Sequence, residues 1–308
     1  MSDRDWITER RLYRRRRLRR RRLVALVAEG ITLVAVSALI TVWATSGGSP
    51  AAESATPSLQ DVAEAPRPTS TTSTPSRSAS GGDSSIERRP LSGKVIAIDP
   101  GHNGLNYLHS SEINRLVNAG TLWKACDTTG TQTNDGYTEA EYNFDVSQRL
   151  ARILRRKGAR VVLTRTNNRG WGPCITERAA IGNRAGADVA ISIHADGGPS
   201  SGRGFHVIYP PSIKGLTDDI AKESRRLGIT IRAAFRRSGM PEATYVGQRG
   251  LNVRSDLGGL NLSDVPKVLF ETGNMRNATD AALLKSAAFR QRAASAIAKG
   301  LTNFLSMH

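Results

Sequence analysis

Cysteine is scarce in this chain, which contains only Cys126 and Cys174 among its 308 residues. Two cysteines exclude a structural zinc finger and a small domain held together by many disulfide bonds. Phosphate-binding glycine motifs are also missing, because neither GxxxxGK[ST] nor GxGxxG occurs. The sequence therefore gives no support for nucleotide binding. It contains no internal repeat either, which argues against a repeat protein.

Acidic residues are outnumbered by basic ones, 27 to 44, which gives a net charge of +17. The excess is uneven, since residues 1–22 hold eleven arginines and a net charge of +8, and the part from residue 91 onward carries +11. A hydrophobic content of 39% excludes a chain that is disordered throughout. The length is typical of about two domains.

Residues 23–45 form a long apolar segment with a single charged residue, Glu29. As a helix this segment would be about 35 Å long, enough to cross a hydrocarbon core of roughly 30 Å. The segment therefore predicts a transmembrane helix that anchors the chain. A cleaved signal peptide is the alternative, but the apolar run of a signal peptide is usually only about 7 to 15 residues long, and no A-x-A site ends this segment cleanly.

The arginines lie on one side of this segment. Eleven precede it within residues 1–22, and the next arginine in the chain is Arg67. The positive-inside rule then predicts a cytoplasmic tail over residues 1–22 and places residues 46–308 on the outer, cell-wall side of the membrane. An arginine run can also bind nucleic acid or anionic lipid. Its position directly before the apolar segment favours a role in topology, so we expect no nucleic-acid partner.

Residues 46–90 are rich in Ser, Thr, Pro, Ala and Gly and contain almost no large apolar residue. Such a segment cannot bury enough apolar surface to fold, and it predicts a disordered linker. A flexible coil of this length has a root-mean-square span of about 35 to 40 Å. We therefore expect the linker to hold the following domain near the membrane while leaving it free to move.

Residues 91–308 alternate between strand patterns and helix patterns, which predicts one α/β domain with a mostly parallel central sheet covered by helices. The predicted strands cover residues 95–99, 160–164, 188–194, 204–209 and 267–271. The predicted helices cover residues 139–157, 176–186, 215–238 and 279–306.

Three of the predicted strands end in residues that can bind a metal or transfer a proton. His102 follows the first strand, His194 ends the DVAISIH strand, and Glu271 ends the KVLFE strand. Ligands of open α/β sheets gather at the carboxyl ends of the strands, so we expect these side chains to converge. Imidazole and carboxylate groups together form the ligand set of a catalytic zinc. A single histidine would more often be a hydrogen-bonded structural residue, but two at equivalent strand ends favour a metal site.

A third zinc ligand is available at the start of the predicted helix 139–157. Glu139 falls on the same helical face as Tyr142 and Val146, which turns toward the sheet, whereas Glu141 falls on the polar face. A buried carboxylate must be paired or bound to a metal. Glu139 therefore completes the candidate ligand set. The alternative is that it only stabilises the helix N-terminus through the helix dipole.

The chain resembles the zinc-dependent N-acetylmuramoyl-L-alanine amidases of the Amidase_3 type, which cut peptidoglycan. The resemblance covers essentially residues 94–305, in order and with similar spacing. Its blocks are IDPGHNG (98–104), EAEYNFDVSQRL (139–150), GARVVLTR (158–165), ERAAIGNRAGADVAISIHAD (177–196) and VPKVLFETGNMRN (265–277).

This resemblance implies that His102, Glu139 and His194 bind zinc and that Glu271 is the catalytic glutamate. It also selects Glu139 over Glu141, because the family's ligand glutamate stands ten residues before an Arg-Leu pair. Two positions depart from the family pattern. Asn103 stands where a second glycine is common, and Asn274 stands where a bulky apolar residue is common.

The reaction implied by the resemblance is hydrolysis of the bond between the lactyl group of N-acetylmuramic acid and L-alanine, by water that zinc activates and Glu271 deprotonates. Peptidoglycan or its fragments would be the partner, and the charge of +11 suits an anionic wall polymer. We expect a monomer. The alternatives are a zinc peptidase that cuts the stem peptide and an inactive wall-binding module, although all four site residues are retained.

The remaining candidates carry weaker signals. The polar stretch 103–138 is long for a loop, so it lines or covers the cleft or is a passive surface excursion. Three other histidines are expected to be structural or solvated, and three residues of the family-like blocks receive no role. The histidines are His109, His206 and His308, and the other three are Arg178, Asn183 and Arg276.

Cys126 and Cys174 are predicted to form a disulfide bond. The predicted topology puts both in a compartment where disulfides persist. Such a bond would tie the stretch 103–138 to the body of the domain. Two buried free thiols are the alternative, and a zinc-binding role is less consistent with the His and Glu ligand set.

Overall fold

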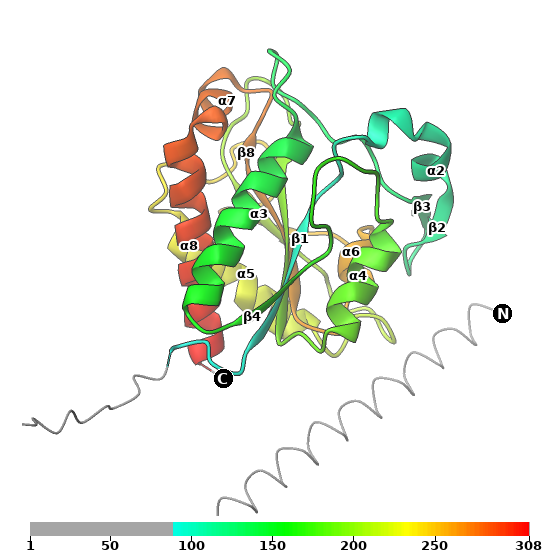
Figure 1. Cartoon of the computed structure of the whole chain (residues 1–308), viewed down its shortest axis with the longest axis vertical. Coiled ribbons are helices and arrows are strands. Elements are labelled where there is room, and N and C mark those ends of the chain that lie inside the picture. Colours follow the sequence, from blue (N-terminus) through cyan, green and yellow to red (C-terminus); the bar gives the residue numbers. More distant parts are fainter. Residues whose placement is uncertain (1–88, 308) are drawn as a thin grey trace, which may run out of the picture. The chain divides into compact units, whose positions relative to one another are not determined.

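The computed structural model describes residues 89–307 (Figure 1). The predicted arginine-rich tail 1–22, the predicted transmembrane segment 23–45, the linker up to residue 88 and His308 lie outside the described residues. Within the described range, none of the helices combines the length and the apolar character that a membrane crossing requires.

A six-stranded sheet forms the centre of the domain, in the order β4-β1-β5-β8-β6-β7. Its strands are β1 (Val95–Pro100), β4 (Arg160–Leu163), β5 (Val189–Asp196), β6 (His206–Tyr209), β7 (Leu251–Val253) and β8 (Lys267–Asn274). The neighbours from β4 to β8 are parallel, whereas β6 pairs with β8 in the antiparallel direction. The predicted α/β fold with a mostly parallel sheet is confirmed.

Three long helices cover one face of the sheet: α3 (Glu139–Arg156), α5 (Ala221–Phe235) and α8 (Ala287–Ser306). Figure 1 shows α3 and α8 side by side over the strands. The buried stripe of α3 includes Tyr142, Val146 and Leu150, spaced as the sequence predicts. Thr138 caps the helix by accepting a hydrogen bond from the backbone N–H of Glu141, and Gly158 follows it with a φ of 97°. These helices bury the large apolar side chains of the strands in one core.

The opposite face has a thinner cover. Helix α4 (Ile175–Arg184) packs on β1, and the single turn α6 (Gly258–Asn261) packs on β8. The apolar cluster on this side consists mainly of small residues, namely Ala97, Ala187, Ala190 and Val265. The same strands therefore present large apolar side chains to one face and small or polar side chains to the other.

The stretch 103–138 has secondary structure of its own. It contains the 3-10 turn η1 (Asn106–Leu108), the short helix α2 (Ser110–Asn114) and an antiparallel hairpin of β2 (Leu116–Asn118) and β3 (Trp123–Ala125). Figure 1 shows α2, β2 and β3 projecting beside the sheet on the side of α4 and α6. We call this part of the chain the lobe.

Two predicted helices differ from the observed ones. The predicted helix 279–306 is two helices, α7 (Ala278–Lys285) and α8, because Ser286 adopts an extended conformation and caps α8 by accepting from the N–H of Phe289. The predicted helix 215–238 begins only at Ala221. Turns hydrogen-bonded to Ile213 and Thr217 occupy the positions before it.

Candidate metal and catalytic site

His102 lies just beyond the carboxyl end of β1. Its φ of 56° is left-handed, which is uncommon for a residue with a side chain. The chain reaches this position through Gly101, which packs directly on the ring of His194. A Cβ atom at Gly101 would lie 2.1 Å from Cε1 of that ring, so no larger residue fits there. The turn after β1 thus places two imidazole rings 5.0 Å apart, centroid to centroid.

The Glu139 carboxylate lies between the two rings. Its Oε1 is 2.8 Å from Nδ1 of His194, and its Oε2 is 3.2 Å from Nε2 of His102. Glu139 is buried at the first position of α3 and also accepts hydrogen bonds from the backbone N–H of Thr131 and from the Asn143 amide. These donors fix the position of the carboxylate between the two rings.

The other nitrogen of each ring has a separate partner. Nδ1 of His102 lies 3.0 Å from the carbonyl oxygen of Thr128, which can only accept, so Nδ1 carries the proton. Nε2 of His194 lies 3.1 Å from Oγ of Ser192, whose own hydrogen goes to Asp99. Both rings therefore turn an unprotonated nitrogen toward Glu139 when they are neutral, which is the arrangement of metal-binding histidines with oriented tautomers.

The charges at this point attract a cation. Burial would lower the pKa of His102, but the carboxylates of Glu139 and Asp127 outweigh this effect and raise the pKa to about 10. Burial opposes ionisation of Glu139 as well, and the two histidines overcome it and hold the pKa of Glu139 well below its usual range. The site thus binds a proton strongly, and a divalent cation would take the place of that proton.

Among residues 89–307, a metal ion could be held by His102, Glu139 and His194. Each offers one ligand atom, and these atoms lie within 4.8 Å of one another. Two imidazole nitrogens and one carboxylate oxygen match the three-ligand set of catalytic zinc sites, which leave a further position open. The geometry brings together the three residues that the sequence analysis names as zinc ligands.

Glu271 lies beside this cluster on β8. It is the register partner of His194 on β5, and register partners project to the same face of a sheet. Its Oε2 is buried and has no hydrogen-bond partner among the described residues. Burial, reinforced by the negative charges of Glu139 and Asp196, raises the pKa of Glu271 well above its usual range. A carboxyl group in this environment is suited to accept and release a proton.

A buried ion network supports the floor of the site. Asp99 accepts hydrogen bonds from Nη1 of Arg178 at 3.0 Å and from Nζ of Lys267 at 3.2 Å. These cations, together with Thr164, overcome the effect of burial and lower the pKa of Asp99 below its usual range. All three ionic side chains are less than one tenth exposed. The network links strand β1 to strand β8 beneath the two histidines.

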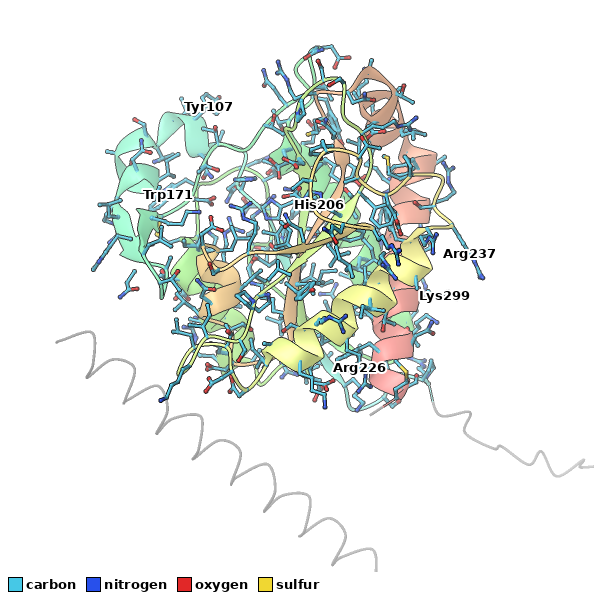
Figure 2. The ribbon with its side chains drawn as sticks, turned by 180° about the vertical axis from the view of Figure 1, so that it is seen from behind. Tyr107, Trp171, His206, Arg226, Arg237 and Lys299 are labelled. Carbon is cyan, nitrogen blue, oxygen red and sulfur yellow. A yellow bond between two sulfur atoms is a disulfide. The ribbon has the colours of Figure 1, made fainter. Side chains whose placement is uncertain are left out.

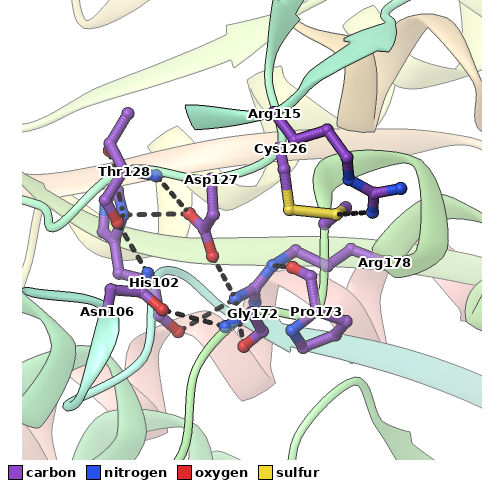
Figure 3. Close-up of a disulfide and its surroundings, with 10 residues drawn as sticks. His102, Asn106, Arg115, Cys126, Asp127, Thr128, Gly172, Pro173 and Arg178 are labelled. Carbon is purple, nitrogen blue, oxygen red and sulfur yellow. Dashed lines mark hydrogen bonds and ion pairs between the residues drawn. A yellow bond between two sulfur atoms is a disulfide. The ribbon is translucent and has the colours of Figure 1, made fainter. Parts of the chain in front are cut away.

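Arg178 also fixes the turn that carries His102 (Figure 3). Its Nη2 donates to the carbonyl oxygen of His102 at 2.9 Å and to the Asp127 carboxylate at 2.9 Å. Asp127 in turn lies 3.3 Å from Nδ1 of His102. Arg178, which received no role from the sequence, therefore holds both the backbone and the ring of a candidate metal ligand in place.

The lobe borders the site, so the stretch 103–138 is not a passive surface excursion. A Cβ atom at Gly130 would lie 2.8 Å from the His102 ring and 2.9 Å from Oε2 of Glu139. The lobe also lines a cavity of about 200 Å³ that runs from His102 and His194 to Lys267 on the thinly covered face of the sheet. Lys124 and Ala125 of the lobe and Gly258–Leu260 complete its walls.

A disulfide bond joins Cys126 in the lobe to Cys174 at the start of α4 (Figure 3). This is the pair that the sequence analysis expects to bridge. The bond stands next to Asp127, and the guanidinium of Arg115 lies 3.5 Å from Sγ of Cys174. It ties the lobe to the helix that carries Arg178.

Most of the remaining sequence candidates have structural partners. The Asn103 amide donates to the carbonyl oxygen of Gly172, and the Asn274 amide donates to those of Pro199 and Gly202, so both departures from the family pattern serve to fix loops. Asn183 binds the backbone at Leu262 and Asp264. His109 stacks on Trp171 and contacts Glu112, and Arg276 is exposed.

Several residues around the site were not predicted from the sequence. Asp99, Asp127, Ser192 and Lys267 received no role. The strand sequences contain a signal for several of them, because Ser192 and His194 alternate with apolar residues in β5, as Lys267 and Glu271 do in β8. This period of two marks one polar face. Asp127 lies in the lobe, where no such pattern applies.

Comparison with known proteins supports a specific family. A sequence profile described as N-acetylmuramoyl-L-alanine amidase matches residues 96–303. A protein of Mycobacterium tuberculosis (strain ATCC 25618 / H37Rv) named N-acetylmuramoyl-L-alanine amidase Rv3717 is 44% identical over 218 residues, covering 70% of this chain and 88% of that protein. The N-acetylmuramoyl-L-alanine amidase LytC of Bacillus subtilis (strain 168) is 28% identical over 219 residues, covering 70% of this chain and 36% of that protein.

Solved structures give the same result. The N-acetylmuramyl-L-alanine amidase Ami1 from Mycobacterium smegmatis is 42% identical, with a TM-score of 0.67, and the match covers 71% of this chain and 99% of that one. The apo form of Ami1 from Mycobacterium abscessus is 40% identical, with a TM-score of 0.66, over 70% of this chain and 100% of that one. The matched part corresponds to the α/β domain.

Proposed function

Because this chain belongs to the N-acetylmuramoyl-L-alanine amidase family, we propose that it is a zinc-dependent peptidoglycan hydrolase that uses the site described above. The bond cleaved is the amide between the lactyl group of N-acetylmuramic acid and L-alanine. The observation that carries the proposal is the convergence of His102, Glu139 and His194, with ligand atoms within 4.8 Å of one another, beside Glu271.

The metal would be held by His102, Glu139 and His194. Nε2 of His102 and Nδ1 of His194 are the nitrogens that face the Glu139 carboxylate. When bound, zinc lowers the pKa of a water molecule and polarises the scissile carbonyl. Asp127 and the Thr128 carbonyl orient the His102 ring, and Ser192 orients that of His194. Such supporting contacts increase metal affinity.

Glu271 acts as the proton carrier. Its carboxylate takes a proton from the attacking water and delivers it to the nitrogen of L-alanine as the C–N bond breaks. The water oxygen ends in the lactyl carboxylate, and the peptide leaves with a free amine. The raised pKa of Glu271 supports this role, because a carboxyl group that binds a proton readily can return it to a leaving amine.

Digestion of purified peptidoglycan tests the proposal. We expect the purified chain to release peptides that begin with L-alanine and to leave glycan strands without peptides, as detected by mass spectrometry. Addition of a chelator should abolish the release, and zinc should restore it. Peptides that are cut between amino acids would instead identify a peptidase of the stem peptide. Binding to the wall without any product would indicate an inactive wall-binding module.

A membrane location is also part of the proposal. It is supported by the apolar segment 23–45, with one charged residue, and by the eleven arginines before it. The N-terminus then lies in the cytoplasm and the amidase domain on the cell-wall side. A protease added to intact cells or spheroplasts should remove the domain and spare the tail. A domain that stays protected until the cells are lysed would contradict this topology.

A further inference from the structure

His206 occupies a special position relative to Glu271. On β6 it is the direct register partner of Glu271 on β8, just as His194 on β5 is the register partner of Glu271 on the other side. Register partners project to the same face of a sheet, with Cβ atoms about 4.5 to 5.5 Å apart in an antiparallel pair. Three neighbouring strands therefore present, in order, His194, Glu271 and His206.

His206 has an unused hydrogen-bonding group. Its side chain is only 2% exposed, and its Nδ1 is buried without a hydrogen-bond partner among the described residues. Glu271 has a buried Oε2 in the same condition. Two unpaired polar atoms on facing positions are costly in a folded protein, because each loses its contact with water. Register pairing places the two side chains on the same face of neighbouring strands, where one polar ligand would give each of these groups a partner.

The environment keeps His206 uncharged. Burial lowers the pKa of His206 to about 4, against the opposing effect of the Asp196 carboxylate and with the help of the Arg254 guanidinium. The ring of Tyr245 packs edge-on against His206 at a centroid distance of 6.1 Å. A neutral imidazole offers one N–H donor and one acceptor, which suits an amide or a carbonyl group better than a carboxylate.

The surroundings of His206 are closely packed. The Tyr245 hydroxyl donates to Oδ2 of Asp196 at 2.9 Å, and the Tyr245 ring packs on Gly198 and Gly202 so closely that a Cβ atom at either would lie within 2.7 Å of it. Figure 2 shows His206 near the middle of the domain, away from Tyr107 and Trp171 at the lobe. The region of His206 is therefore distinct from the lobe side of the cleft.

The order of the three residues predicts how the substrate lies. In the proposed reaction the scissile carbonyl is near His194 and the leaving nitrogen is near Glu271, which protonates it. The next polar group beyond that nitrogen is the carbonyl of L-alanine. A substrate that crosses the strand ends in this direction brings the alanyl carbonyl to β6, whereas the sugar extends toward β1 and the lobe.

We propose that His206 is a substrate-binding residue that donates a hydrogen bond to the carbonyl of the first stem-peptide residue, and thereby fixes the direction of the substrate across the sheet. This inference rests on the proposed amidase function and adds to it the residue that recognises the peptide side. His206 takes no part in proton transfer. It selects peptide-bearing substrates and positions the leaving nitrogen over Glu271.

The test compares two substrates with two proteins, the native full-length chain and its His206→Phe variant. The first substrate is N-acetylmuramoyl-L-alanine carrying a blocked carboxyl group, and the second has an alkylamine in place of alanine and therefore lacks the carbonyl. For the native chain we expect kcat/KM to fall about three- to tenfold on loss of the carbonyl, mainly through KM, as for one neutral hydrogen bond.

The His206→Phe variant should lose a similar factor with the first substrate and show no further loss with the second, because the two changes remove the same contact. His206→Asn, whose amide can donate from a similar place, should recover part of the loss. His109→Phe is the matched control and should behave as the native chain does. Zinc content and thermal unfolding of each variant show whether it has folded.

Two outcomes overturn the inference. One is a native chain that cleaves both substrates equally well, a result that does not depend on whether any variant folds. The other is a His206→Phe chain that folds, binds zinc and still responds to the missing carbonyl as the native chain does. If the native chain cleaves neither substrate, the amidase function itself fails, and the inference that rests on it fails too. The first two outcomes leave the amidase function intact.

Discussion

The two faces of the central sheet are built from alternate residues of the same strands and differ in almost every property. Toward α3, α5 and α8 the strands present Ile98, Ile193 and Phe270, all fully buried in one apolar core. Toward the cleft, the residues next to them in the strands are Asp99, Ser192 and His194. Glu271, which follows Phe270, is the register partner of His194 and lies on the same face. One face stabilises the fold, and the other is organised around charges.

This difference explains how a reactive site is tolerated. A buried ion network such as that of Asp99 and its partners adds little net stability, because desolvation offsets much of the charge attraction. The apolar face stabilises the domain independently. Substitutions on the cleft face should therefore mainly affect turnover and zinc binding. Substitutions on the core face should mainly lower the free energy of unfolding.

The largest expected effect is that of removing a candidate metal ligand. His194→Ala should lose most of its bound zinc and fall to background activity while remaining folded, because a catalytic metal site contributes less to folding than a structural one. Elemental analysis, activity and thermal unfolding measure the three quantities. His109→Ala, on the lobe, should keep its zinc. A His194→Ala chain with stoichiometric zinc would show that the ligand assignment is wrong.

The second largest effect is expected for Glu271, the proposed proton carrier. Glu271→Gln should retain zinc and stability but lose a factor of about 10² to 10⁴ in kcat, the usual contribution of general acid-base catalysis. Glu141→Gln, an exposed glutamate at the start of α3, serves as the control and should have native turnover. Near-normal activity of Glu271→Gln would remove Glu271 from the mechanism.

Substitutions at two adjacent residues of β8 compare how much each face contributes to the stability of the domain. Phe270→Ala should lower the free energy of unfolding by about 3 to 5 kcal/mol, because it opens a cavity in the large core. Leu269→Ala, which is half-buried and lines the cleft, should cost less than about 2 kcal/mol. Urea unfolding with equal m-values gives both numbers. Equal losses at the two positions would contradict the division of roles between the faces.

Much of the fold and of the candidate site could be predicted from the sequence. The α/β class and the convergence of the strand-end residues His102, His194 and Glu271 follow from strand patterns and from the geometry of parallel sheets. Glu139 follows from helical periodicity. The hairpin of the lobe and the short elements β7 and α6 could not be predicted, because segments of three or four residues carry too little periodicity and depend on tertiary contacts.

The supporting residues were harder to predict for a different reason. Asp127 and Arg178 are 51 positions apart in the chain, and their pairing depends on how the lobe folds back on α4. His206 gave no local sign of a role, because its relation to Glu271 arises only when β6 inserts antiparallel beside β8. Local patterns identify a polar face, but pairing across the sheet decides which polar residues meet.

The disulfide bond links the lobe to the helix beneath the cleft. Replacing both Cys126 and Cys174 with alanine should lower the free energy of unfolding by about 2 to 4 kcal/mol, as expected for a closed loop of this length. Zinc should stay bound, because the bond holds the lobe rather than a ligand. Denaturant unfolding and metal analysis test this together, and thiol counting on the unreduced protein should find no reactive thiol. Loss of zinc in the double variant would mean that the lobe itself maintains the metal site.

The smallest expected effect is a change in stability at acidic pH. Asp99 has a pKa below its unfolded value of about 3.9, so its contribution to stability is complete above that pH and is lost as the pH falls below it. Asp99→Asn should have a lower free energy of unfolding than the native chain at pH 7. This gap between the two proteins should stay the same down to about pH 5 and become smaller below about pH 4. Urea unfolding across this range measures the gap. A gap that stays constant in acid would show that the network does not depend on an ionised Asp99.

The central claim is that this cleft directs water to the lactyl carbonyl of muramic acid. Digestion of a muropeptide in heavy-oxygen water tests it most directly, because the label marks the carbon that water attacks. We expect the label in the lactyl carboxylate of the sugar product and no label in the released peptide, which begins with L-alanine. Label in a carboxylate of the peptide, with the sugar still attached to alanine, would contradict it.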